Sequence, residues 1–301
     1  MEVIYLNQTD KIKEECVLCL GYFDGLHLGH QKLLDKTIEI AKKSHLKKAL
    51  LTFSMNPKSY LLNQKEQYLT PLDYKKDFLE AIDFDYIIVV DVDVLGLQEK
   101  QFIEQYILNH NIKAVVCGYD FKYGSNRSGN IETLKNYQQF ELFVVDKCEL
   151  DHQRVSSTQI KEFIIKGQIE QANRFLGRPY MIQGKVVHGK KRGKILLGFA
   201  TANVDYQNYI MPKRGVYGVE VLIENQNYKG MANIGLNPTF GDIEVPTLEV
   251  HIFDFDKMIY DQNINVYFQF FVRDEKKFSS FDNLVNQLNQ DMFNIKENFI
   301  N

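Results

Sequence analysis

The chain has 301 residues, more than one hydrophobic core usually serves, so we expect two domains. Hydrophobic residues make up 45% of it and charged residues 25%, which excludes long disordered regions. The net charge of −3 gives no general attraction to nucleic acid or to an anionic membrane, so neither is an expected partner. The sequence has no apolar run of about 18 residues and no N-terminal basic leader, so we expect a cytoplasmic protein.

Two of the four cysteines, Cys16 and Cys19, have the C-x-x-C spacing of redox and zinc sites. No second close pair completes a zinc set, since Cys117 and Cys148 are far apart. Cys16 and Cys19 lie in an apolar run, where cysteine behaves as a small hydrophobic residue. A structural role is the prediction.

The first half of the chain alternates short apolar runs with helical patterns. This alternation predicts a parallel α/β sheet with right-handed crossovers, in which ligands bind beyond the carboxyl ends of the strands. The predicted strands are residues 17–20, 49–53, 86–90, 114–117 and 142–145, and the predicted helices are residues 31–43, 72–82, 98–110 and 131–137.

The segment GYFDGLHLGH, residues 21–30, follows the first of these strands and precedes the first helix. Its glycines, Gly21, Gly25 and Gly29, would let backbone approach a ligand closely. His27 and His30 would face the first helical turn, where free N–H groups and the helix dipole favour an anion. The pattern indicates a polyphosphate site, and a strand–turn–helix corner that merely contains histidines is the alternative.

A second glycine-bearing loop, GYDFKYG at residues 118–124, follows the predicted strand that ends at residue 117. Both loops would lie at the same edge of the sheet. Further along, Ser157 or Thr158 would cap a helix, and Arg154 could bring a cation to the same helix start. Short helical patterns follow at residues 159–166 and 169–175.

The sequence Gly-Arg-Pro at residues 177–179 ends the helical pattern, so we place a domain boundary between residues 178 and 179. Beyond it, side-chain character alternates with period two, which predicts an antiparallel barrel or sandwich. A final amphipathic helix at about residues 281–295 would pack on it. The predicted strands are residues 182–188, 201–204, 216–224, 229–233, 247–255 and 264–272.

Three features of this second half bear on chemistry. Residues 184–190 fit a Walker A loop superficially, but Lys191 occupies the Ser/Thr position. The basic loop of residues 189–194, which includes Gly189 and Lys190, could cover phosphates or be a solvated hairpin turn. Thr201 and Asn203 would share one strand face, where their oxygens could hold Mg²⁺ or serve structure alone. Glu249, on the face opposite Leu248 and Val250, could take a proton from a hydroxyl or be a plain exposed glutamate.

These motifs together resemble the bacterial bifunctional riboflavin kinase/FAD synthetase family over nearly the whole chain. The likeness is carried by residues 21–30, by residues 117–124 and by residues 154–158 in the first half. In the second half it is carried by residues 198–203, 215–217, 232–240, 248–255 and 273–278.

The resemblance implies residues 1–178 as a Rossmann-like FMN adenylyltransferase domain and residues 179–301 as a six-stranded riboflavin kinase β-barrel with a C-terminal helix. Riboflavin, FMN and ATP would be the substrates, with Mg²⁺ as cofactor, and the oligomeric state stays open. Glu249 would be the kinase base, Thr201 and Asn203 the magnesium ligands, and His27 and His30 the residues that stabilise the triphosphate. The other implied nucleotide contacts are Gly21, Phe23, Asp24, Gly25, Gly118, Asp120, Arg154, Ser157, Thr158, Gly189 and Lys190, and the implied flavin contacts are Asn56, Pro57, Asn233 and Arg273.

Three residues depart from the family's usual motifs. Asn56 replaces a histidine after the second predicted strand, in a loop that would contact flavin. Ala200 replaces a proline before Thr201, which frees the backbone beside the predicted metal ligands. Lys161 replaces an arginine, so the charge stays but bidentate phosphate binding would be lost.

Three alternatives differ in activity. One is a riboflavin kinase with a weakened adenylyltransferase, which absence of FAD formation from FMN and ATP would reveal. Another is a different nucleotidyltransferase, such as a cytidylyltransferase, which the kinase-like second half disfavours. The third is a non-catalytic flavin-binding regulator, a class that we expect to have lost Glu249 or the two histidines.

Overall fold

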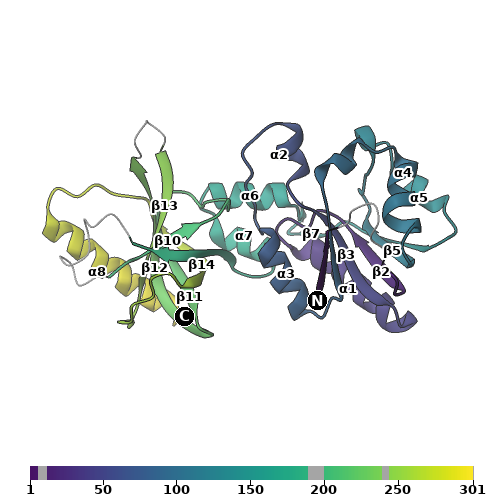
Figure 1. Ribbon diagram of the computed structural model, residues 1–301. Coiled ribbons are helices and arrows are strands. Elements are labelled where there is room, and N and C mark those ends of the chain that lie inside the picture. The colour runs from purple at the N-terminus through teal and green to yellow at the C-terminus, as the bar shows by residue number, and fades with distance from the viewer. Residues whose placement is uncertain (6–11, 189–199, 239–243, 301) are drawn as a thin grey trace. The chain divides into compact units, whose positions relative to one another are not determined.

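The computed structural model describes residues 1–5, 12–188, 200–238 and 244–300. The chain divides into two compact units, Met1–Ser157 and Thr158–Asn301 (Figure 1). Helices α6 (Ser157–Ile165) and α7 (Ile169–Leu176) group mainly with the second unit, so a division of activities at residue 178 stays a prediction. Across the described residues, no helix has the length and apolar character to span a membrane.

The first unit contains the predicted parallel α/β sheet, with strand order β1-β4-β3-β2-β5-β6. The short edge strand β1, which pairs with β4, is missing from the sequence prediction. Its alternation is too short to separate it from a loop, since only four residues take part. The strands are β1 (Glu2–Tyr5), β2 (Cys16–Leu20), β3 (Lys47–Phe53), β4 (Tyr86–Val90), β5 (Ile112–Gly118) and β6 (Glu141–Val145).

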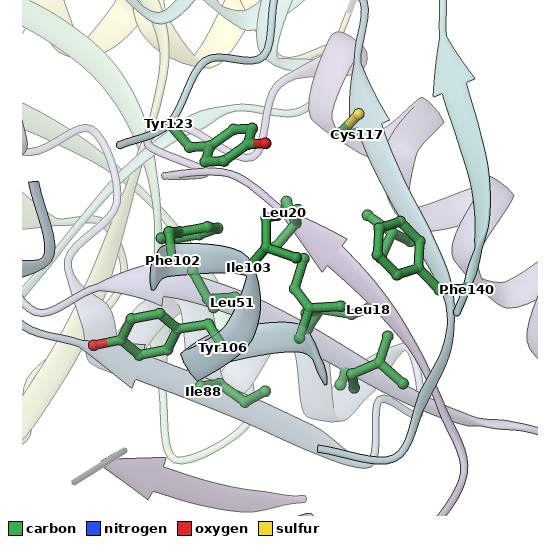
Figure 2. Packing of buried hydrophobic residues seen from close by; sticks show 14 of the residues in the cluster. Leu18, Leu20, Leu51, Ile88, Phe102, Ile103, Tyr106, Cys117, Tyr123 and Phe140 are labelled. Carbon is green, nitrogen blue, oxygen red and sulfur yellow. The ribbon is translucent and has the colours of Figure 1, made fainter. Parts of the chain in front are cut away.

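Helices cover both faces of this sheet. Side chains of β2 alternate between two core clusters: Val17 and Cys19 pack with α1 (Leu28–Ser44) and α3 (Leu72–Ala81), whereas Leu18 and Leu20 pack with the helices of the other face. Figure 2 shows that second cluster, in which Leu18 and Leu20 meet Phe102 and Ile103. Because both faces are covered, the strand is apolar throughout.

The helices of the second face are shorter than the sequence predicts. The predicted helix at residues 98–110 is α4 (Glu99–Ile103) followed by a π-helical turn, Glu104–Leu108. The remaining elements are α5 (Ile131–Lys135), α2 (Pro57–Leu61), the short helical turns Val92–Gly96 and Ser125–Arg127, and the ribbon of β7 (Glu149–Leu150) with β8 (Gln153–Arg154).

The cysteines are buried and free, which agrees with their predicted structural role. Cys16 and Cys19 point to opposite faces of β2, because an i, i+3 spacing on a strand reverses the side. Burial raises the pKa of Cys19 to about 12. Among the described residues, no group of three His, Cys, Asp or Glu side chains is arranged to hold a metal ion.

The second unit contains a closed antiparallel barrel with strand order β10-β13-β12-β11-β14-β9, as the resemblance implied (Figure 1). Its interior is apolar, with Val219, Val250 and Val266 fully buried. Asn173 of α7 fastens the helix to the barrel, since its Nδ2 donates to the Phe268 carbonyl over 2.8 Å. The elements are β9 (Tyr180–Val187), β10 (Ala202–Tyr206), β11 (Gly215–Ile223), β12 (Gln226–Pro238), β13 (Glu244–Ile252), β14 (Asn263–Arg273) and α8 (Phe281–Asn298).

Candidate functional site

The first candidate site lies at the point where the strand order of the parallel sheet reverses. The chain passes from β2 through α1 to β3 on one side of β2, and β5 pairs with β2 on the other side. Such a switch point is where open α/β sheets bind their ligands. The loops that follow β2 and β5 therefore lie at one sheet edge, as the sequence predicts.

His27 and His30 come together at the start of α1. His27 is the N-cap residue, and its Nδ1 accepts a hydrogen bond from the His30 backbone N–H over 3.2 Å. The two imidazoles stack with ring centroids 3.7 Å apart. The first turn of α1 carries no acidic side chain, so no carboxylate competes with a bound anion for the positive end of the helix dipole. The arrangement suits an anion.

The turn between β2 and α1, residues 21–27, has an unusual backbone and is called the glycine turn below. Phe23, Gly25 and Leu26 have φ of 57°, 96° and 43°. A Cβ at Gly21 would lie 2.9 Å from the Phe23 ring, and one at Gly29 would lie 3.2 Å from the His27 ring. The Phe23 ring therefore leaves no room for a side chain at Gly21, and the His27 ring leaves little room at Gly29, whatever a ligand does. Phe23 is itself fully buried in the core, so only its backbone can face a nucleotide.

Asp24, a predicted nucleotide contact, anchors the glycine turn. Its side chain is 2% exposed, and its Oδ1 accepts hydrogen bonds from the backbone N–H groups of Leu69 (2.8 Å) and Thr70 (3.1 Å). The Gly25 N–H in turn donates to Thr70 Oγ1 over 2.8 Å. Ser157 joins the same anchor, because its hydroxyl donates to the Asp24 carbonyl over 2.7 Å. α6 begins at Ser157, so Ser157 and Thr158 are not its N-cap.

Beyond β5, Asp120 and Arg154 form an exposed ion pair, with 2.5 Å between Asp120 Oδ2 and Arg154 Nη2. The Arg154 guanidinium also lies 5.3 Å from the centre of the Tyr119 ring. Gly118 is the last residue of β5. The structure thus brings two predicted nucleotide contacts, one acidic and one basic, into direct contact with each other.

The predicted flavin contacts Asn56 and Pro57 form the start of α2. Asn56 is its N-cap, with Oδ1 accepting from the backbone N–H groups of Lys58 (2.9 Å) and Ser59 (3.4 Å). Pro57 occupies the first helical position, which proline favours. The asparagine that departs from the family pattern therefore serves the local fold.

Two residues near the glycine turn escaped sequence reasoning, Thr52 and Lys75. Both are buried, and both contact the Tyr22 carbonyl. Lys75 could have been noticed in the sequence, because it lies between Leu72 and Leu79 on the apolar face of α3, where a lysine is unusual.

The second candidate site is a row of cross-strand partners on the outer face of the barrel. Asn203 of β10 pairs with Glu249 of β13, and Glu249 pairs with Asn233 of β12. Leu248 and Val250, the neighbours of Glu249 along its strand, are buried in the barrel, so Glu249 points outward. We call these three polar residues the barrel row. Thr201 lies just before β10 and is exposed.

Burial raises the pKa of the Glu249 carboxyl above its ordinary value. Its carboxylate makes no hydrogen bond or ion pair with any residue that the structure describes. A Cβ at Gly235 would lie 3.3 Å from Glu275 Oε1 and 3.5 Å from Asn233 Nδ2, so glycine makes room for the Glu275 carboxylate beside the barrel row. A partly desolvated, unpaired carboxylate is suited to accept a proton.

The row continues to Arg273 at the end of β14 through Val216, its partner on β11. Arg273 makes a forked ion pair with Asp291 of α8, with Nε–Oδ2 of 2.9 Å and Nη2–Oδ2 of 2.6 Å. The Asp291 side chain is 1% exposed and that of Arg273 is 13% exposed. This predicted flavin contact therefore joins the barrel to α8. Gly189 and Lys190 lie outside the described residues.

The fold and the two sites define a two-unit protein in which a nucleotidyltransferase-like α/β sheet precedes an antiparallel barrel. The FAD synthetase family model matches residues 9–159, and the riboflavin kinase family model matches residues 176–299. The chain belongs to the bifunctional riboflavin kinase/FMN adenylyltransferase family.

Relatives of this family match nearly end to end. The chain is 36% identical to the bifunctional riboflavin kinase/FMN adenylyltransferase of Listeria monocytogenes, over 97% of this chain and 96% of the relative. It is 38% identical to that of Bacillus subtilis, over 93% and 92%. A solved structure from Streptococcus pneumoniae, described as a macrolide-efflux protein, superposes with a TM-score of 0.90 at 35% identity, covering 98% of both chains.

Proposed function

We propose that this chain catalyses two consecutive reactions. The barrel transfers the γ-phosphate of ATP to riboflavin, giving FMN and ADP. The α/β unit then transfers the adenylyl group of a second ATP to FMN, giving FAD and pyrophosphate. The observation that carries the proposal is the presence of two separate sites, one per unit, in a chain whose relatives are named for both activities.

In the α/β unit, an FMN phosphate oxygen attacks the α-phosphorus of ATP, and the bond to pyrophosphate breaks. The attacking phosphate is already ionised near neutral pH, so the protein has little proton transfer to perform. Positioning and charge neutralisation supply the catalysis. His27 and His30 at the start of α1 bind the triphosphate, and Arg154 at the end of β8 contacts the phosphates as well. Gly118, Asp120 and Thr158 complete the nucleotide contacts.

In the barrel, Glu249 accepts the proton of the ribityl 5′-hydroxyl as that oxygen attacks the γ-phosphorus. Glu249 supports this role by its raised pKa and by the absence of a partner among the described residues. Asn233 and Arg273, on the same outer row, contact riboflavin. In the α/β unit, Asn56 and Pro57 separately contact the FMN that is adenylylated there.

Mg²⁺ fits the barrel site. Its preferred ligands are oxygens, and it binds through few protein groups when it carries nucleotide phosphates. Thr201 and Asn203 supply such oxygens beside Glu249, since Asn203 and Glu249 are direct cross-strand partners. The ion would neutralise phosphate charge as it develops.

The test is product analysis over time from riboflavin, ATP and Mg²⁺. FMN should accumulate first and FAD should follow. Incubation with FMN and ATP should give FAD and pyrophosphate directly. Formation of FMN without FAD would support the kinase with a weakened adenylyltransferase, and formation of neither would support the binding regulator.

A further inference from the structure

Lys75 is a lysine that lies buried inside the α/β unit. It lies on α3 with 2% of its surface exposed, and no other lysine among the described residues is classed as buried. An ammonium group is costly to remove from water unless it is held by specific partners. We therefore expect the buried ammonium group of Lys75 to have a specific role.

The ammonium group of Lys75 is directed at the first peptide of the glycine turn. Its Nζ donates to the Tyr22 carbonyl over 2.8 Å and lies 4.2 Å from the centre of the Tyr22 ring. Thr52 Oγ1 donates to the same carbonyl over 2.8 Å. Lys75 Nζ also lies 3.4 Å from Thr52 Oγ1. One carbonyl thus receives two buried donors, and one of them is a cation.

The peptide held in this way begins the strained part of the glycine turn. Phe23 and Leu26 adopt positive φ, which side-chain-bearing residues seldom do. Such backbone persists only where its surroundings enforce it. Lys75 and Thr52 hold the backbone at Tyr22. Two residues later, the hydrogen bonds of Asp24 with the Leu69 and Thr70 N–H groups hold it again. The turn is therefore fixed from outside at two points before it reaches His27.

We propose that Lys75 is a positioning residue for adenylyl transfer. By holding the Tyr22 carbonyl, it sets the path of the glycine turn and so the place of the His27 and His30 rings and of the free N–H groups of α1. Lys75 itself contacts no substrate. The inference rests on the proposed adenylyltransferase function of this site.

The test compares two variants on one helix in the full-length chain. Lys75→Met keeps the side-chain length and removes the charge and the donor. Lys76→Met is the matched control, because Lys76 lies on the same helix, pairs with Asp73 over 3.1 Å and with Tyr5, and makes no contact with the glycine turn. Misplacement of catalytic groups by about 1 Å costs roughly a hundredfold in rate. We expect Lys75→Met to lower kcat for FAD formation by about that factor, while Lys76→Met and the kinase activity of both variants stay within about twofold of wild type.

Measuring kcat and Tm separately distinguishes a positioning role of Lys75 from a role in folding stability alone. Assays run well below the unfolding transition, on protein shown to be fully folded by circular dichroism, should still show the lowered kcat. Lys75→Arg, which keeps the charge and donors, should recover part of the rate. A lower Tm with unchanged kcat in Lys75→Met would overturn the proposal, and so would an equal fall in kinase activity.

Thr52→Val gives a second, milder variant that keeps the inference testable if Lys75→Met does not fold. It removes the other donor to the Tyr22 carbonyl and keeps the shape of the side chain. A several-fold fall in kcat for FAD formation would support the proposal, and an unchanged kcat would overturn it. Failure of the wild-type chain to form FAD would instead refute the proposed function itself.

Discussion

Glu249 is the carboxylate that we expect to accept a proton in the barrel. Its strand neighbours Leu248 and Val250 point into the barrel, and its own side chain is partly covered on the outer face. Withdrawal from water raises its pKa, and no described residue offers a cation that would lower it again. The group is thus a stronger base than an ordinary glutamate.

Kinase activity should therefore depend on pH through Glu249. The ionised form is the active one, so activity should fall as pH drops through a pKa above 4.5, its ordinary value. A profile of kcat/KM for FMN formation measures it. Glu249→Gln should abolish FMN formation and leave FAD formation from supplied FMN intact. An acid limb at or below 4.5, or loss of both activities in the variant, would contradict the assignment.

The same raised pKa makes Glu249 a cost to stability at neutral pH. A carboxyl whose folded pKa is raised stabilises the fold only at low pH, and that contribution is lost as pH rises through the folded pKa. Glu249→Gln stays neutral, so its barrel should melt at a higher temperature than wild type at pH 7. The difference should shrink as pH is lowered toward 4. An equal or lower Tm at pH 7 would show that burial of Glu249 costs nothing.

At the scale of elements, α8 is held to the barrel by an ion pair in addition to apolar contacts. Ile295 and Met292 of α8 pack against Val216 and Met231 of the barrel. Beside these apolar contacts, Asp291 forms an ion pair with Arg273. Gln287 Nε2 donates to Asp291 Oδ1 over 2.8 Å, so the carboxylate has several donors. The end of β14 is thereby tied to the C-terminal helix.

Removing one partner of this pair should destabilise the barrel strongly. Asp291→Ala leaves a largely buried guanidinium unpaired, which costs about 3–5 kcal/mol in comparable sites. Urea unfolding followed by circular dichroism measures the loss. Lys296→Ala is the control, because its pair with Asp254 spans 3.5 Å at the surface and should be worth at most about 1 kcal/mol. Equal effects of the two variants would show that the Arg273 pair is not a buried one in energetic terms.

At the scale of the whole molecule, the two activities should be separable. His30→Ala removes one of the two histidines that we propose to bind the triphosphate, and it should abolish FAD formation while sparing the kinase. Glu249→Gln should do the reverse. A mixture of the two variants, given riboflavin, ATP and Mg²⁺, should make FAD, because FMN released by one can be used by the other. Failure of the mixture, with each variant retaining its own activity, would show that FMN does not pass between molecules.

Much of this architecture could be predicted from the sequence, because both halves have strong periodicity. The apolar strands and the period-two strands place residues 21–30 at a sheet edge and Glu249 on an outward face, as the structure has them. Strand β1 and helix α2 were missed because four or five residues are too few to establish a period. The predicted helix at residues 98–110 ends early in a π-helical turn, which no apolar period distinguishes from an α-helix.

The residues of the two candidate sites stand out in the sequence, whereas the residues that hold them in place do not. Histidines and glycines carry a recognisable spacing, and so does Glu249 among apolar neighbours. Lys75 supports the glycine turn from 53 positions along the chain, and Asp24 reaches Leu69 across 45. Contacts of that range leave no local pattern. Tertiary structure alone also reveals that Phe23 is buried and that Asn56 caps α2.

The pairing of the barrel row limits which changes in chain length the kinase half can accept. Side chains alternate along β13, so adding or deleting one residue within it would turn Glu249 into the barrel and Leu248 out to water. The two-residue turn between β11 and β12, at Glu224 and Asn225, lies beyond the last paired residues and leaves the row untouched. Insertions that appear among descendants of this chain, or that an engineer makes to carry a tag, should therefore succeed at that turn and fail within β13.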